Sequence, residues 1–340
     1  MKIGILNGGG DCAGLNAVTR AVVKRAGDYG WDVLGIRYGW EGFLNKDTMK
    51  LSFDNVEKLV GSGGTILKSS RTNPAKHPQG FETIMKNFKE LSLDAVICVG
   101  GDDTLGVAAQ LFKRGLKVVG VPKTMDNDLS STDYTFGFDS AVNEATHAID
   151  NLRTTAESHD RVFIVEVMGR EAGWVAAYSG IAGGANLVLI PEEPFDLNEV
   201  ISFVKKRHET GEKATVIVIS EGATLKNMQG VDQEKVDEFG HVRLGGIGQF
   251  LGDQIEKATK YDTRVSVLGH MIRGGSPTAF DRVLSTRFGL AAVDLIKEGK
   301  FGMMVALRGT QIVPVSLEES TSKQRLLDKE ILRVIDMVSY

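Results

Sequence analysis

The sequence predicts an α/β protein with two three-layer αβα lobes and mainly parallel sheets. Short runs rich in β-branched residues alternate with helical stretches along most of the chain, which is typical of parallel sheets wrapped by helices. The 340 residues exceed the roughly 250–300 that one core organises. The 40 glycines fit many tight strand-to-helix turns. We therefore expect two Rossmann-like lobes, with the functional site in the cleft between them.

Eight buried strands and seven helices follow from the pattern. The expected strands are Lys2–Leu6, Trp31–Ile36, Ala95–Val99, Lys117–Val121, Val162–Val167, Asn186–Ile190, Thr215–Ser220 and Val265–Leu268. The expected helices are Leu15–Gly27, Thr104–Lys113, Ser140–Thr155, Ala172–Ala182, Leu197–Glu209, Gly248–Thr259 and Ala279–Lys297. The charged, amphipathic tail Leu317–Val338 predicts a terminal helix packed on the surface.

The lobes are not separated by a Pro/Ser-rich linker, so we expect the chain to cross between them more than once. The first lobe is expected to hold residues 1–138 and about 262–305. The second lobe is expected to hold about 139–261 and 306–340. The polar stretch Ala223–Gly246 is interpreted as an excursion between a strand and a helix.

Composition restricts the classes of partner. A net charge of −4 argues against a general polyanion binder, so no nucleic-acid partner is expected, while local basic pockets remain possible for small phosphates. Cys12 and Cys98 are the two cysteines, a usage typical of a reducing compartment without disulfides. No apolar run approaches the ~20 residues of a membrane span, and the N-terminus opens with a strand. We expect a cytoplasmic protein with no membrane partner.

The first glycine-rich loop, NGGGDCAGLN at 7–16, follows a strand and opens a helix. Free backbone N–H groups and the helix dipole make this layout an anion site. A dinucleotide fingerprint does not fit, because Gly14 comes one place late and the second strand ends in Arg37 rather than an acidic residue. The loop therefore favours phosphate binding over an NAD-dependent oxidoreductase.

The second loop, VGGDDTLG at 99–106, places two carboxylates beside a glycine turn. Carboxylates at a phosphate site require a cation between them and the phosphate. Asp102 is the candidate ligand for Mg²⁺, which prefers one or two protein carboxylates with phosphate oxygens and water. The alternative is that Asp103 only caps a helix beginning near Thr104.

The third loop, VPKTMDNDL at 121–129, also ends a strand. Phosphoryl transfer to an alcohol needs a carboxylate that accepts the hydroxyl proton, and Asp126 or Asp128 can supply it. Asp-Asn-Asp is also common turn chemistry, so the motif alone leaves that alternative open.

Three further segments carry candidate residues. In VEVMGREAGW at 165–174, Arg170 can neutralise charge on a transferring group, or can be a surface arginine at a helix entry. Glu221 ends a strand where a carboxylate can accept hydrogen bonds from sugar hydroxyls. In LGHMIRGGSPTAFDR at 268–282, His270 and Arg273 form a plausible clamp for a phosphate monoester, although a lone histidine is more often structural.

Together these segments resemble the 6-phosphofructokinase family, in the right order from Met1 to about Gly309. The resemblance implies that Asp126 deprotonates the sugar 1-hydroxyl, with Thr124 and Asp128 around the same centre. It implies that Asp102 carries Mg²⁺. Donor phosphates would be lined by Gly9, Gly10, Arg71 and Thr104. The sugar phosphate and the reacting group would be held by Met168, Gly169, Arg170, Glu221, His270 and Arg273.

Two further arginines bear on assembly. Arg161 and Arg264 match arginines that, in the family, reach the 6-phosphate from a neighbouring subunit. The resemblance therefore implies a homodimer or homotetramer with shared active sites.

The resemblance also bears on the donor. ATP-using members carry Gly where this chain has Asp103 and Lys123. A carboxylate near the α-phosphate of ATP adds repulsion of about 4 kcal/mol for unit charges at ~4 Å and an effective dielectric of about 20. Lys123 can pair with Asp103 or with a pyrophosphate oxygen. We therefore expect reversible transfer from pyrophosphate to the 1-hydroxyl of fructose 6-phosphate, giving fructose 1,6-bisphosphate and phosphate.

Three alternatives stay open. An ATP-dependent 6-phosphofructokinase is the first, and Trp40 supports it because ATP-dependent relatives often place an aromatic side chain against adenine there. NAD and lipid kinases share a Gly-Gly-Asp loop but lack the Thr-x-Asp-Asn-Asp and Met-Gly-Arg segments. A regulator that binds sugar phosphates without chemistry would not require the base Asp126.

Overall fold

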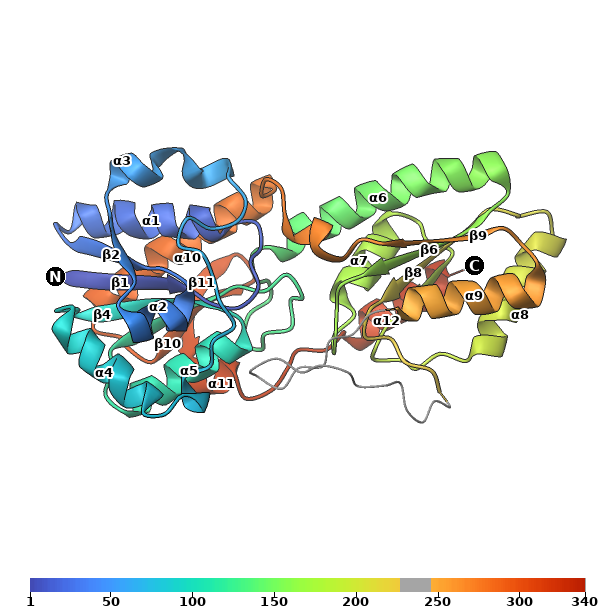
Figure 1. Ribbon diagram of the computed structural model, residues 1–340. Helices are drawn as coiled ribbons and strands as arrows, with labels where there is room; N and C mark the ends of the chain where they lie inside the picture. The colour runs from blue at the N-terminus through green and yellow to red at the C-terminus, as the bar shows by residue number, and fades with distance from the viewer. Residues whose placement is uncertain (227–245, 340) are drawn as a thin grey trace.

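The computed structural model describes residues 1–226 and 246–339, which form two lobes side by side (Figure 1). One lobe holds a seven-stranded sheet of order β11-β10-β5-β4-β1-β2-β3, and the other holds a four-stranded sheet of order β7-β8-β6-β9. We call them the seven-stranded lobe and the four-stranded lobe. The predicted α/β architecture with mainly parallel sheets is confirmed.

The seven-stranded sheet is parallel except at its edges. Its parallel strands are β1 (Lys2–Asn7), β2 (Asp32–Ile36), β4 (Ala95–Gly100), β5 (Val118–Pro122) and β10 (Met303–Arg308), and its antiparallel edge strands are β3 (Thr48–Leu51) and β11 (Gln311–Ser316). Every residue of β4 and β5 is buried, as expected for central strands covered on both faces.

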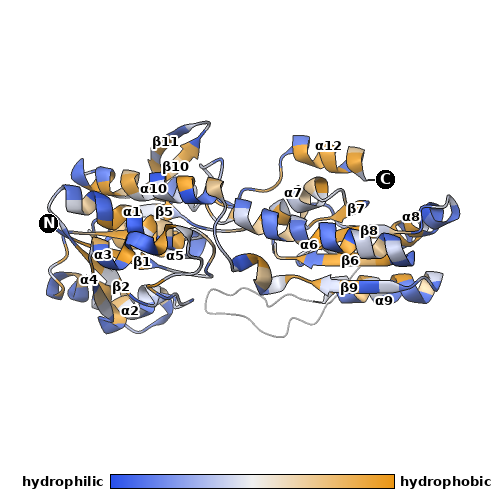
Figure 2. Ribbon diagram, turned by 90° about the horizontal axis from the view of Figure 1, so that it is seen from above, coloured by the Kyte–Doolittle hydropathy of each residue, from blue (hydrophilic) through white to orange (hydrophobic). Residues whose placement is uncertain are grey.

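Helices cover both faces of this sheet. On one face lie α1 (Leu15–Asp28), α3 (Phe53–Val56) and α10 (Ala279–Lys297). On the other lie α2 (Gly39–Asn45), α4 (Gly80–Glu90), α5 (Asp102–Lys113) and α11 (Leu317–Ser320). The strands are apolar, and the polar residues of the helices lie mainly on their outer faces (Figure 2). The two buried layers are the core of this lobe.

The four-stranded sheet is parallel throughout. Its strands are β6 (Val162–Val167), β7 (Leu187–Leu189), β8 (Thr215–Ser220) and β9 (Thr263–Val267). One face is covered by α6 (Phe138–His159), α7 (Trp174–Ala182) and α12 (Lys329–Val338), and the other by α8 (Leu197–Glu209) and α9 (Ile247–Thr259). Helix α6 runs from the seven-stranded lobe into the four-stranded lobe (Figure 1).

Sheet membership differs from the expected lobe boundaries. Strand β9 pairs with β6 in the four-stranded sheet, whereas the prediction placed about 262–305 in the first lobe. Strands β10 and β11 extend the seven-stranded sheet, although 306–340 was expected in the second lobe. Strands β9 and β10 each pair with a strand distant in sequence, and β11 follows β10 in a hairpin, so the local pattern does not reveal which sheet they join. Of the two helices in the predicted tail, α12 packs in the four-stranded lobe, against α7 and β7, and α11 packs in the seven-stranded lobe.

Other differences are smaller. The predicted terminal helix Leu317–Val338 is two helices, α11 and α12, joined by an extended segment at 321–328. The pattern did not predict β3, β10, β11, α2 or α4. The predicted excursion Ala223–Gly246 lies mostly outside the described residues. Among residues 1–226 and 246–339, no helix combines the length and the hydrophobicity needed to span a lipid bilayer.

Candidate active site

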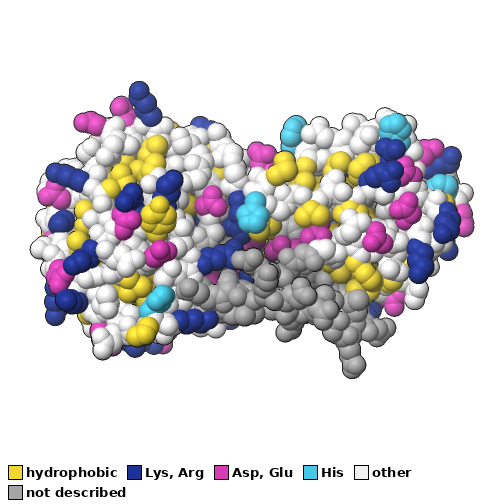
Figure 3. Space-filling view, in the orientation of Figure 1, with side chains coloured by type: hydrophobic (Ala, Val, Ile, Leu, Met, Phe, Trp, Pro, Cys, Tyr) yellow, Lys and Arg dark blue, Asp and Glu magenta, His cyan; other side chains and the backbone are white. Residues whose placement is uncertain are grey.

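A cavity lies in the waist between the lobes, where loops at the carboxyl ends of both sheets meet. In the surface view, Lys and Arg side chains gather at this waist with Asp and Glu beside them (Figure 3). The predicted site residues that line the cavity are Gly9, Gly10, Arg71, Asp102, Asp103, Thr104, Lys123, Thr124, Asp126, Asp128, Arg170, Glu221 and Arg273. Most residues that line the cavity were therefore predicted correctly from the rule that ligands bind beyond the carboxyl ends of parallel strands.

The glycine-rich loop after β1 allows close approach to the cavity. A side chain at Gly10 would collide with the Arg273 guanidinium, so glycine makes room for that arginine. The amides of Gly8 and Gly9 donate to the carbonyls of Val99 and Ser70 at 2.9 and 3.0 Å. These two N–H groups are therefore used within the fold, and the expectation that the whole loop offers free donors is too broad.

Both carboxylates of the second loop stand in the first turn of α5. The helix begins at Asp102, two residues earlier than predicted, and Gly101 occupies the N-cap position. Asp103 is therefore not the N-cap residue. Both carboxylates instead lie beside the positive end of the helix dipole, which favours negative charge there. Thr104 is buried beneath them.

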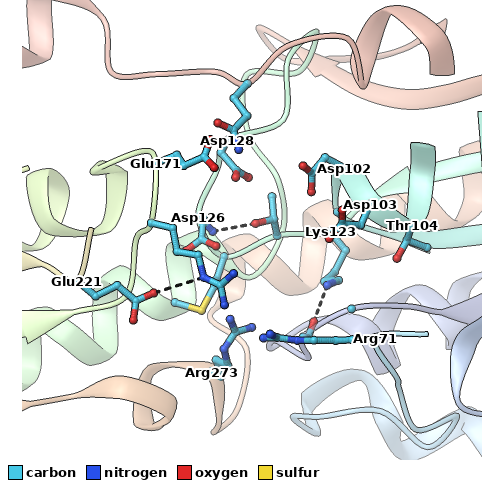
Figure 4. A pocket seen from close by; sticks show the side chains of 17 residues that line it. Arg71, Asp102, Asp103, Thr104, Lys123, Asp126, Asp128, Glu171, Glu221 and Arg273 are labelled. Atoms are coloured by element: carbon cyan, nitrogen blue, oxygen red, sulfur yellow. Dashed lines mark hydrogen bonds and ion pairs between the residues drawn. The ribbon is translucent and has the colours of Figure 1, made fainter. Parts of the chain in front are cut away.

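Lys123 is a buried cation at the centre of the site. Its side chain is 4% exposed, and its ammonium donates to the carbonyl of Gly10 (Figure 4). Burial lowers the pKa of Lys123, and the nearby Arg273 lowers it further. The ammonium thus donates a hydrogen bond to the glycine-rich loop after β1, and Lys123 also lines the cavity.

Two carboxylates on the loop after β5 are held at raised pKa. The backbone N–H of Asp126 donates to Thr124 Oγ1 at 3.0 Å, and Asp126 Oδ1 is buried without a hydrogen-bond partner in the described structure. Burial raises the pKa of Asp126, against the nearby arginines. Burial and the charges of Asp126 and Asp102 raise the pKa of Asp128 to about 7. An unpartnered carboxylate oxygen at raised pKa suits a general base.

The four-stranded lobe supplies the other wall. Arg170 Nε lies 4.0 Å from Glu221 Oε1, and burial followed by the charge of Asp126 raises the pKa of Glu221. Gly169 has φ +143°, and a side chain there would meet the Ala172 carbonyl at 2.8 Å, so this turn requires glycine. The position of Arg170 at the cavity thus depends on a backbone turn that few other residues can make.

Arg273 joins the two lobes across the cavity. It extends from the segment after β9, and its Nη1 donates to the carbonyl of Asp11 at 3.1 Å. Its Nε lies 3.3 Å from the sulfur of Met168. In Figure 4, Arg71, Arg273 and the ammonium of Lys123 lie on one side, and acidic side chains including Asp128 lie on the other.

Five predicted residues do not line the cavity. Met168 and Gly169 directly precede the lining residue Arg170 in the chain, and His270 is exposed in the short helix Gly269–Arg273. Arg161 and Arg264 both pair with Asp262, at 2.5 Å each. These arginines stand at the amino ends of β6 and β9, about 20 Å of strand away from the cavity. A chain cannot bring them to its own site without rearrangement.

The structure also adds and removes candidates. Gly101, Met125, Glu171 and Gln324 line the cavity and were not predicted. Glu171 directly follows the predicted Arg170, so the MGRE segment carried a signal for it. Trp40, considered as a contact for adenine, is 2% exposed and stacks on Phe43, so its ring lies inside the core rather than facing a ligand.

The lining fits a bound divalent cation. It holds six carboxylates against four basic groups, so a cation and an anionic donor would balance the charge better than the donor alone. No group of three or more His, Cys, Asp or Glu side chains arranged for a metal occurs in the described ranges. Mg²⁺ does not need one, because it binds through one or two carboxylates and substrate phosphates. Asp102, whose carboxylate lines the cavity, meets that requirement.

The crowded carboxylates predict a pH-dependent stability. Because the pKa of Asp128 rises from 3.8 to about 7 on folding, the folded protein binds the proton more tightly and loses stability as pH rises through that window. With a chelator present, Asp128→Asn should exceed the wild type in unfolding free energy by about 2 kcal/mol at pH 8. Denaturant unfolding at pH 8 and pH 4 measures this difference.

The gain should be much smaller near pH 4, where Asp128 is protonated in the folded state and about half protonated in the unfolded state. Asp133→Asn, which changes an exposed carboxylate on the same loop, is the matched control. A gain that is equal at both pH values would contradict the assigned cause.

Comparison with known proteins agrees with this site. A family model described as phosphofructokinase matches residues 2–296. The chain is 54% identical over 332 residues to a pyrophosphate–fructose 6-phosphate 1-phosphotransferase of Amycolatopsis methanolica, covering 97% of each chain. It is 50% identical over 322 residues to ATP-dependent 6-phosphofructokinase 3 of Streptomyces coelicolor, covering 94% of each.

Solved structures agree. A crystal structure of Pichia pastoris phosphofructokinase in the T-state aligns with a TM-score of 0.84 and 29% identity, covering 99% of this chain and 36% of that longer chain. From its matched motifs, its relatives and its fold, the chain belongs to the phosphofructokinase family.

Proposed function

We propose that this protein transfers a phosphoryl group from pyrophosphate to the 1-hydroxyl of fructose 6-phosphate, giving fructose 1,6-bisphosphate and phosphate in a reversible step. The observation that carries the proposal is one cavity that brings together an unpartnered carboxylate, Asp126, and the charged residues Asp103 and Lys123. The name of the Amycolatopsis methanolica relative supports pyrophosphate as donor.

Asp126 acts as the base. Burial raises its pKa, and its free oxygen can accept a hydrogen bond from the attacking hydroxyl. Phosphoryl transfer depends mostly on positioning and on stabilising the charge of the transferring group. Arg170 and Lys123 enter the cavity from opposite lobes and can neutralise that charge.

The remaining groups bind and orient. Asp102 would hold Mg²⁺, and the cation would offset the negative charge of the donor phosphates. Arg71 and Gly10 lie where donor phosphates would enter, and Glu221 faces the sugar hydroxyls. His270 and Arg273 are the proposed anchors of the acceptor, although only Arg273 lines the cavity in this structure.

ATP-dependent transfer is the second candidate, favoured by the Streptomyces coelicolor relative. Two observations in this chain weigh against it. Asp103 lines the donor side of the cavity, where it would repel an additional phosphate, and Trp40 is buried away from any adenine. Pyrophosphate has neither an additional phosphate for Asp103 to repel nor an adenine that needs an aromatic contact.

Initial rates measured side by side with pyrophosphate and with ATP test the donor. We expect kcat/KM with pyrophosphate to exceed that with ATP by at least about 100-fold, a smaller factor than the three decades that unscreened repulsion would give. Both rates should fall to background when a chelator removes Mg²⁺. A higher kcat/KM with ATP would overturn the donor assignment, and chelator-resistant turnover would overturn the role of Asp102.

The active site is proposed to be shared between subunits of a homodimer or homotetramer. Arg161 and Arg264 lie too far from the cavity of their own chain to hold its sugar phosphate, as a role in a neighbouring site requires. A cytoplasmic location is also proposed, since Cys12 and Cys98 are buried and unpaired.

A further inference from the structure

An extended segment near the C-terminus crosses between the lobes. Residues 321–328, which we call the C-terminal strap, leave α11 in the seven-stranded lobe and enter α12 in the four-stranded lobe (Figure 1). The strap lies beyond residues 2–296, which the family model matches. None of the motifs that identified the family includes it.

The strap fastens the loop that carries Asp126 and Asp128. The backbone N–H of Arg325 donates to the carbonyl of Asp128 at 2.7 Å, and Gln324 forms an antiparallel bridge with Leu129. Arg325 Nη1 donates to the carbonyl of Asp133 at 2.7 Å. Backbone and side chain of one residue thus hold the loop at two carbonyls, and Gln324 lines the cavity itself.

The same residue grips the four-stranded lobe. Trp174 Nε1 donates to the carbonyl of Arg325 at 2.9 Å, and the guanidinium carbon lies 4.3 Å from the Trp174 ring centroid. Trp174 is the first residue of α7, four positions after Arg170. Alongside, Glu192 accepts from the amides of Leu327 and Gly173 at 3.1 and 3.0 Å. The turn that presents Arg170 is therefore tied to the strap.

We propose that Arg325 is a positioning residue for phosphoryl transfer, because it fastens the Asp126 loop of one lobe to the start of α7 in the other. The reacting groups come from both lobes, and displacements near 1 Å cost up to about 100-fold in rate. Arg suits this role because its planar fork can stack on an indole and donate a hydrogen bond together, which an ammonium does less well. The inference relies on the proposed function for the choice of substrates.

Arg325→Ala tests the proposal. We expect kcat to fall about tenfold, with KM for donor and acceptor within about twofold, since no substrate contact is removed. Arg325→Lys should recover part of kcat through its retained charge. Tryptophan emission should also change in Arg325→Ala, because the guanidinium over Trp174 is lost. Lys323→Ala, an exposed position on the same strap, is the matched control and should retain wild-type kcat.

Thermal unfolding of each variant separates positioning from stability. A reduced kcat at temperatures where Arg325→Ala is fully folded supports the proposal. A wild-type kcat in Arg325→Ala, or a loss of similar size in Lys323→Ala, overturns it. All variants are assayed with pyrophosphate and with ATP. If the wild type prefers ATP, the proposed donor is wrong. The ratio of the variant kcat to the wild-type kcat, measured with ATP, then decides the role of Arg325.

Discussion

Asp126→Ser is expected to lower kcat about 1,000-fold while the acceptor still binds. A positioned general base contributes roughly 100- to 10,000-fold, and no other carboxylate in the cavity has an oxygen recorded as buried and unpartnered. The variant should fold at least as well as the wild type, because it removes a buried carboxylate whose charged form is disfavoured. Steady-state rates, calorimetric binding of fructose 6-phosphate and thermal unfolding measure the three quantities.

The control for Asp126→Ser is Asp133→Ser, which changes an exposed carboxylate on the same loop outside the cavity. It should keep near-wild-type kcat. Turnover by Asp126→Ser at the wild-type rate would remove Asp126 from the role of base. Loss of both turnover and acceptor binding would instead assign Asp126 to substrate binding.

Replacing Asp103 and Lys123 together by Gly should change the donor preference. Removing the Lys123 ammonium takes away a charge at the donor phosphates, so kcat/KM with pyrophosphate should fall about 100-fold. Removing the Asp103 carboxylate relieves repulsion of an additional phosphate, so kcat/KM with ATP should rise about tenfold. Initial rates measured over a range of ATP and of pyrophosphate concentrations give both changes in kcat/KM.

Glu82→Gly provides the matched control for the helix effect, because Glu82 is an exposed acidic residue in the first turn of α4 as Asp103 is in α5. It should leave the donor ratio unchanged. The single variants Asp103→Gly and Lys123→Gly assign each effect to its side chain. Unaltered pyrophosphate kinetics in the double variant would refute the electrostatic account of donor choice.

The sequence located the site because strand ends are readable locally. Loops after β1, β4 and β5 each follow a buried apolar run, and parallel pairing brings their carboxyl ends to one edge. The sequence did not predict that Gln324 lines the cavity, because the strap is brought there by a backbone pairing with Leu129 that no local pattern indicates. Burial of Trp40 was equally invisible, since it depends on how α2 packs beneath the sheet.

Lobe assignment failed for a related reason. Of the apolar residues of β9, Val265 is partly buried and Val267 is exposed, and nothing in the sequence of β9 distinguishes pairing with β6 from pairing with a strand of the larger sheet. The expectation of one terminal helix failed because the strap separates two helical segments. Both are tertiary choices made between partners far apart along the chain.

Helix α6 limits how the lobes can move. It is one uninterrupted rod of 22 residues, which corresponds to about 33 Å. A sharp bend within it would break hydrogen bonds of the helix, so we expect a large opening of the lobes to pivot at its ends. Gly137, at φ +95°, stands at the N-terminal end of the helix. A side chain at this position would collide with Sγ of Cys12, which lies on the glycine-rich loop after β1. A change of backbone torsion at this glycine would turn the four-stranded lobe and at the same time shift the contact with Cys12 on that loop.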